Sequence, residues 1–171
     1  MYLTTVGNPE YDTYMLLRQT NQLIEKLISR RCRMNGLTAP GLEVLYTVMA
    51  GPKPMSAYLL ARILGREHHS VVEIVNRLKA KGFIIRKTIN GKPSLSVTAE
   101  GAEIAAKILS TPIILPVFEA LGRDNIQKLR DSLMPLRAEA MHDLGLLDLG
   151  EMQFTAVDEV VREASGRGTN K

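Results

Sequence analysis

The feature that most constrains the fold is the stretch from residue 56 to residue 98, in which the spacing of the apolar residues changes twice. The first part has apolar residues at helical intervals and stops at Gly65. A second helical run stops at Gly82, and its apolar residues recur three and four positions apart at Val71, Ile74, Val75 and Leu78. Glycine is a common helix end because it adopts the left-handed conformation without steric cost. The pattern therefore predicts two short helices joined by a sharp turn.

Beyond Gly82 the apolar spacing becomes that of β-strands. Residues 83–88 and 94–98 are short strand-like runs, and Asn90 and Gly91 lie between them. Asn-Gly is the dipeptide that best suits a two-residue hairpin turn. Helix, turn, helix and hairpin in this order make a winged helix-turn-helix, whose second helix enters the major groove of DNA. We therefore predict a mainly α-helical fold with a small β-hairpin wing.

The positive charge of the chain is concentrated on this same stretch. The formal net charge of the chain is only +4. Residues 51–100 contain nine basic and three acidic residues, whereas residues 101–171 contain eight basic and eleven acidic residues. A basic face that coincides with a helix-turn-helix favours binding to a polyanion, and double-stranded DNA is the expected partner.

Long amphipathic helices are predicted on both sides of this stretch. Residues 10–34 carry a broad apolar stripe, and a further helix is expected to begin after Thr38. Behind the wing, one helix begins at Thr98, and Pro112 and Pro116 should kink or break the chain after it. The final long helix begins at residues 124–125, and Pro135 should bend or divide it. One more short helix is expected over residues 151–163, with disorder from residue 165 to the end.

These patterns divide the chain into four parts. Residues 1–36 are expected to form an N-terminal dimerisation helix, and residues 37–98 the winged helix-turn-helix DNA-binding domain. Residues 99–146 are expected to form the C-terminal dimerisation helices, and residues 147–171 a short helix and a flexible tail. Dimerisation is expected because the first and last long helices have broad apolar faces and little else in the chain to cover them.

The order of elements resembles the MarR family of bacterial transcription regulators over residues 10–144. The run LLARILGREHHSVVEIVNRLKAKGFIIRK followed by LSVTAEG carries this resemblance. The resemblance implies a homodimer whose N- and C-terminal helices interlock, with each lobe presenting one winged helix to half of a near-palindromic operator. It therefore implies a sequence-specific transcriptional regulator of double-stranded DNA, with repression as the expected mode.

The resemblance also indicates which residues face DNA. The second helix of the pair carries groove-facing polar residues, and the wing carries residues that reach the phosphate backbone or the minor groove. The candidates are Ser56, Arg66, His68, His69, Ser70, Glu73, Arg77, Arg86, Lys87, Asn90 and Lys92. Glu73 either accepts a hydrogen bond from cytosine or pairs with Arg77 one turn later. Ser56 is equally well explained as a helix cap, and the two histidines as surface residues.

Two kinds of effector are considered. Relatives in the family commonly bind small aromatic anions between the dimer helices and the winged helix, and the candidates for such a cleft are Tyr14, Arg18, Tyr46 and Met49. Cys32 is a redox candidate, because Arg30, Arg31 and Arg33 surround it in the sequence and positive charge lowers the pKa of a thiol. A passive cysteine within a helix and aromatic residues that only fill the core are the simpler alternatives.

Other classes of protein are disfavoured by the sequence. No phosphate loop, nucleophile–base pair or metal-ligand spacing is present, so we expect no enzyme, no cofactor and no metal site. No secretory signal or long apolar run is present, and a single cysteine suits a reducing cytoplasm. The remaining alternative is a winged-helix protein-interaction module with only non-specific DNA affinity, which the salt dependence of DNA binding would distinguish.

Overall fold

The computed structural model describes residues 7–109 and 115–146. In chain order its elements are α1 (Pro9–Met34), α2 (Ala39–Ala50), α3 (Ala57–Leu64), α4 (His68–Ala80), β1 (Ile84–Ile89), β2 (Lys92–Val97), α5 (Ala99–Leu109), α6 (Leu115–Glu119) and α7 (Arg123–Asp143). The structure thus confirms the predicted mainly helical fold with one antiparallel hairpin.

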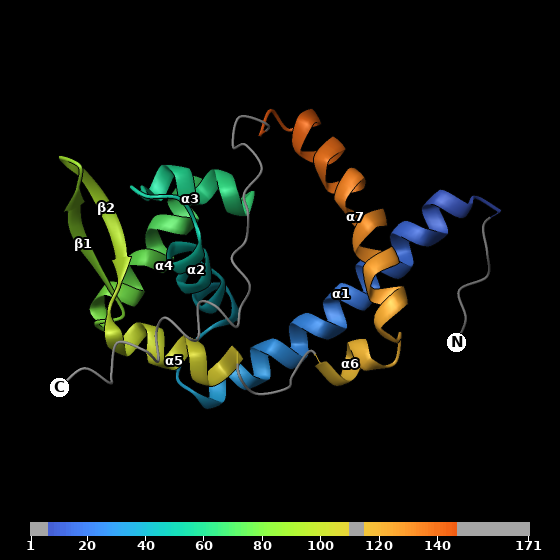
Figure 1. Cartoon of the computed structure of the whole chain (residues 1–171), viewed down its shortest axis with the longest axis horizontal. Coiled ribbons are helices and arrows are strands. Elements are labelled where there is room, and N and C mark those ends of the chain that lie inside the picture. Colours follow the sequence, from blue (N-terminus) through green and yellow to red (C-terminus); the bar gives the residue numbers. More distant parts are fainter. Residues whose placement is uncertain (1–6, 110–114, 147–171) are drawn as a thin grey trace.

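The elements form a lobe and an arm (Figure 1). The lobe contains α2, α3, α4 and the hairpin, and α5 runs beneath it toward the end of α1. The outer half of α1, α6 and α7 form the arm, which extends away from the lobe. The hydrophobic core lies mainly in the lobe, and its most completely buried large side chains include Leu45, Met55, Leu60, Ile84 and Ile108.

Local capping explains where the helices of the lobe begin. The Oγ1 of Thr38 accepts a hydrogen bond from the Gly41 amide at 3.1 Å, and the Oγ of Ser56 accepts one from the Leu59 amide at 3.0 Å. Each bond satisfies an amide that has no partner within its helix. Gly65 ends α3 in the left-handed conformation, with φ of 60°. The predicted caps and the sharp turn before α4 are therefore confirmed.

The hairpin has the predicted two-residue turn. Ile89 pairs with Lys92, which leaves Asn90 and Gly91 as the loop, and both have positive φ, at 51° and 74°. A type I′ turn requires positive φ at both central residues, and its twist matches that of the two strands it joins. The base of the wing is tied to the segment before α3, because the Leu95 amide donates to the carbonyl of Met55 at 2.7 Å.

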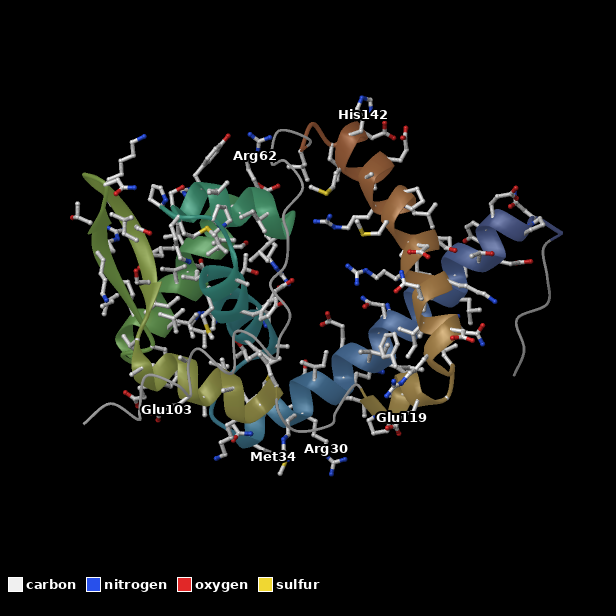
Figure 2. All side chains as sticks on the ribbon, in the orientation of Figure 1. Arg30, Met34, Arg62, Glu103, Glu119 and His142 are labelled. Atoms are coloured by element: carbon white, nitrogen blue, oxygen red, sulfur yellow. The ribbon has the colours of Figure 1, made fainter. Side chains whose placement is uncertain are left out.

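The helices of the arm are largely uncovered within one chain. Cys32, near the inner end, is the only buried residue of α1, and no residue of α7 is buried. Arg30 and Met34 project outward from α1 (Figure 2). At the far end of α7, the carbonyl of Gly145 accepts a hydrogen bond of 3.1 Å from Nη2 of Arg62 on α3. Figure 2 shows Arg62 and His142 along the upper edge of the molecule, Arg62 on the lobe and His142 on the arm.

Pro116 and Pro135 both lie within helices of the arm. Pro116 lies in the first turn of α6, which begins at residue 115, so this proline does not interrupt a helix. The kink or break predicted at Pro112 lies outside the described residues. Pro135 does not divide the last helix, since α7 continues through it from residue 123 to residue 143. The helix and the disordered tail predicted after residue 150 lie outside the described residues. None of the described helices is both long and apolar enough to cross a membrane.

Candidate nucleic-acid interface

Helix α4 separates an apolar face from a polar one. Its buried residues are Val71, Ile74, Val75 and Leu78, as the sequence predicts. The other side exposes His69, Glu73 and Arg77, while Ser70 is half-buried. His68 is the first residue of the helix and is also exposed. Because the buried residues anchor the helix in the lobe, the polar residues form a presented surface rather than a second core face.

Glu73 and Arg77 form the ion pair expected from their spacing. Oε2 of Glu73 lies 3.8 Å from Nη2 of Arg77, and Nε of Arg77 donates to the Glu73 carbonyl at 3.4 Å. Both side chains are largely exposed, so the pair is weak and screened by water. The pairing therefore leaves both side chains available at the surface of α4.

The hydroxyl of Ser56 caps α3. It accepts the hydrogen bond that caps α3, and the residue is exposed. A hydroxyl that accepts one hydrogen bond still has its own proton to donate. Ser56 can therefore cap α3 and donate to a phosphate oxygen at the same time.

Arg66 is held by another helix of the lobe. Its Nε and Nη2 lie 3.2 Å and 2.8 Å from Oε2 of Glu43 on α2. The backbone amide of Arg66 donates to the carbonyl of Ala61 at 3.0 Å. These bonds fix the turn before α4. The structure thus gives Arg66 a role in placing α4, in addition to the DNA contact expected from the sequence.

The basic residues of the wing lie on its exposed surface. Arg86 and Lys87 are on β1, Lys92 begins β2, and Asn90 is at the tip. All four are exposed. Helix α4 and the hairpin belong to the same lobe (Figure 1). Ser56 precedes α3 as its cap, and the other ten sequence-predicted DNA candidates lie on the turn before α4, on α4 and on the wing.

Two exposed residues beside these candidates were missed by the sequence analysis. Asn76 follows Glu73 by one turn on the exposed side of α4, and asparagine is a common reader of adenine. Its position three residues after Glu73 could have indicated it. Tyr58 lies on the first turn of α3, and its ring centroid is 6.3 Å from that of His68. Only the tertiary structure brings Tyr58 beside α4, since the two residues lie on different helices.

Solved structures share this arrangement. A MarR-family transcriptional regulator from Rhodococcus sp. RHA1 aligns with a TM-score of 0.67 and 17% identity, over 75% of this chain and 96% of that one. MepR of S. aureus, solved in complex with DNA, aligns with a TM-score of 0.67 and 14% identity, over 78% and 99%. CouR of Rhodococcus jostii RHA1, solved with p-coumaroyl-CoA, aligns with a TM-score of 0.68 and 15% identity, over 78% and 95%.

The chain has the MarR-family fold. No protein-family model matches its sequence. No curated protein matches it by sequence either. At 14–17% identity, the chain shares the backbone arrangement of these proteins, while most of its side chains differ from theirs.

The ligand candidates of this MarR-type fold lie on two helices. Tyr14 and Arg18 are exposed one turn apart on the outer half of α1. Tyr46 and Met49 are half-buried on α2, and burial raises the pKa of Tyr46. A separate apolar groove of about 530 Å³ lies between the helices of the arm, and none of the four candidates lines it. Its lining consists of Leu17, Phe118, Ile126, Leu129, Arg130, Leu133, Met134, Leu136 and Arg137.

Cys32 is not the reactive thiolate that its sequence neighbours suggested. Its side chain is 0% exposed and packs in the core. Burial raises the pKa of the Cys32 thiol, because the charged form loses its hydration. The sequence-based expectation of a lowered thiol pKa is therefore wrong. Adjacent arginines in a helix point in different directions, and their charge does not offset the desolvation of this side chain.

One group of possible metal ligands occurs within the described ranges. Glu139, His142 and Asp143 lie on the last turns of α7, with ligand atoms within 4.8 Å of one another. All three are exposed. Spacings of three and four residues bring side chains together on any helix, so their proximity follows from helical geometry alone.

Proposed function

We propose that the chain is a MarR-type transcriptional regulator that binds double-stranded DNA sequence-specifically as a homodimer. The observation that carries this proposal is the exposed polar face of α4, backed by a buried apolar face. His69, Glu73 and Arg77 on this face have the donors and acceptors that read base edges in a major groove. The basic wing beside it supplies sequence-independent attraction to phosphates.

The uncovered arm supports the homodimer. Seven large apolar residues of α1 are exposed, namely Tyr11, Tyr14, Leu16, Leu17, Leu23, Leu27 and Met34. Helices α6 and α7 expose Val117, Met134 and Leu136, and Leu121 and Leu144 are exposed beside them. So many large apolar side chains exposed on one part of a single chain favour an interaction site. A two-fold dimer would also place two copies of α4 about 34 Å apart, the spacing of successive major grooves.

A near-palindromic operator and repression are the expected consequences. Two symmetric half-sites match two symmetric lobes, and a bound dimer obstructs transcription when its operator overlaps a promoter. The fold shared with MepR, which was solved in complex with DNA, supports DNA as the partner. A reducing cytoplasm, where the DNA is, remains the expected location.

We extend the proposal to a small aromatic effector. Two structures with this fold were solved with aromatic molecules, CouR with p-coumaroyl-CoA and RdhR-CbdbA1625 with 2,4-dichlorophenol. Tyr14 and Arg18 on α1, with Tyr46 and Met49 on α2, remain the candidate contacts. Release of DNA requires that the effector bind one lobe arrangement more tightly than the other.

The test is fluorescence anisotropy with the DNA upstream of the gene for this protein, measured over a series of salt concentrations. We expect tight binding of one dimer that survives competitor DNA and weakens with salt. Lys87→Ala on the wing should reduce the salt slope by about 1, whereas Arg77→Ala should alter which sequence is preferred. Lys26→Ala on α1 is the matched control and should change neither quantity.

The same experiment tests the alternative of a protein-interaction module. Equally weak binding to every sequence, including a library of random duplexes, would contradict sequence-specific regulation. It would leave the winged helix with only a generic basic surface.

A further inference from the structure

Tyr58 is an exposed aromatic residue at the edge of the DNA-reading surface. Its side chain is 63% exposed on the first turn of α3. An exposed aromatic ring contributes little to the core, so the stability of the lobe does not explain it. Its neighbour in space is His68, the first residue of α4.

The two rings form a tilted aromatic contact between the two helices. Their centroids are 6.3 Å apart and their planes meet at 58°. Aromatic pairs favour tilted and offset arrangements with centroids 4.5–7 Å apart. The contact therefore joins the first turns of α3 and α4 at the surface.

His68 lies at the end of α4 from which side chains would contact DNA bases. It starts α4, and residues near the start of a recognition helix contact base edges. Glu67, which precedes it, makes no side-chain cap to α4, so the local hydrogen bonds of a cap do not restrain this turn. A free imidazole at such a position would lose rotamer freedom on binding, and that loss weakens the contact.

We propose that Tyr58 is a positioning residue for DNA recognition, holding the imidazole of His68 against its ring so that His68 reads one operator base pair. This inference rests on the proposed DNA-binding function. Tyr58 acts through His68 and sharpens discrimination at that base pair. Its effect on affinity for unrelated DNA is small.

The test compares Tyr58→Ala, Tyr58→Phe, His68→Ala and the double Ala variant on the operator and on operators with each base pair replaced in turn. Tyr58→Ala should lose discrimination roughly two- to tenfold at the base pair where His68→Ala loses it, which is the range of aromatic pair strengths. The double variant should lose no more than His68→Ala alone. Tyr58→Phe retains the ring and should restore the discrimination of the wild type.

Three outcomes overturn the proposal. Losses that add in the double variant show that the two residues act independently. A loss shared by Tyr58→Phe and Tyr58→Ala assigns the effect to the hydroxyl. An equal loss of affinity for every DNA sequence in Tyr58→Ala would indicate that Tyr58 contacts a phosphate instead.

A measurement without DNA separates this proposal from the proposed function. The ring of Tyr58 should shift the imidazole proton resonances of His68, and Tyr58→Leu should abolish that shift while Glu103→Ala, on exposed α5 surface, retains it. If the His68 resonances are the same in Tyr58→Leu as in the wild type, Tyr58 does not contact His68 in solution. That result would contradict the positioning role of Tyr58 but not the proposed DNA-binding function. A wild-type protein that shows the shift but discriminates no sequence contradicts the proposed function and, with it, the role given to Tyr58.

Discussion

The hydroxyl of Ser94 joins the wing to the segment before α3. It accepts a hydrogen bond from the Met55 amide at 2.9 Å and donates one to the Leu95 carbonyl at 3.1 Å. The side chain is 2% exposed, so water cannot replace these partners. The hydrogen bond from Met55 spans 39 residues of sequence and fixes where the hairpin leaves the lobe.

Ser94→Ala should therefore destabilise the protein. The Met55 amide would remain buried without a partner, and such a loss costs about 1–3 kcal/mol. Urea unfolding followed by circular dichroism would measure the change in the free energy of unfolding. Ser96→Ala on the same strand, at a half-buried position, is the control and should have a smaller effect. Equal losses in the two variants would show that the buried hydrogen bond is not what stabilises this junction.

The thiol pKa of Cys32 is set by burial rather than by its neighbours in the sequence. Three arginines next to Cys32 in sequence suggested a reactive thiol, but the raised pKa follows from its place in the core. Sequence neighbours give the charge near the backbone, whereas the solvation of the sulfur depends on which distant residues cover it.

Helix α5 begins in close contact with the end of the wing. Thr98 caps it, with Oγ1 accepting from the Gly101 amide at 3.0 Å and donating to the Gly82 carbonyl at 2.8 Å. A Cβ built on Gly101 would lie 2.3 Å from the Phe83 carbonyl oxygen and 2.9 Å from Cγ1 of Val97. Gly101 thus permits α5 to approach the base of the hairpin, which keeps the wing in place.

Gly101→Ala should reverse the usual effect of this substitution. Within a helix, replacing glycine by alanine ordinarily stabilises by about 1 kcal/mol. Here the added carbon meets a backbone carbonyl that cannot move aside, and overpacking of this kind costs about 1–3 kcal/mol. Thermal unfolding would give the sign. Ala102→Gly at the next helical position should cost only about 0.5–1 kcal/mol. A stabilised Gly101→Ala protein would contradict the close packing of α5 on the wing.

At the scale of the whole molecule, the apolar arm is completed by a second copy in the proposed dimer. Leu23 on α1 is 62% exposed in the single chain. Leu23→Glu would place a carboxylate within the dimer interface, where desolvation opposes its charge. We expect this variant to sediment as a monomer and to lose tight binding to a palindromic operator.

Gln22→Glu is the matched control for Leu23→Glu. It adds the same charge at the adjacent exposed position on the polar side of α1 and should leave the dimer intact. Analytical ultracentrifugation over a range of protein concentrations would measure both. Equal dissociation of the two variants, or of neither, would show that the apolar stripe of α1 does not form the interface.

The sequence alone determined the elements of the lobe and most of the proposed DNA-reading surface. The two glycine stops, the caps Thr38 and Ser56 and the Asn90-Gly91 turn act through bonds within about four residues, so the chain encodes them locally. The buried and exposed sides of α4 follow from helical periodicity in the same way.

Which side chains meet across elements depends on how the helices and the hairpin pack together. The tertiary structure placed Arg66 on Glu43, Tyr58 beside His68 and Cys32 in the core, and α7 remained one helix through Pro135. Each of the first three results depends on packing between residues far apart in sequence, which no local periodicity records. Periodicity sets which side of a helix is apolar, whereas the partners on that side are set only when the helices pack against one another.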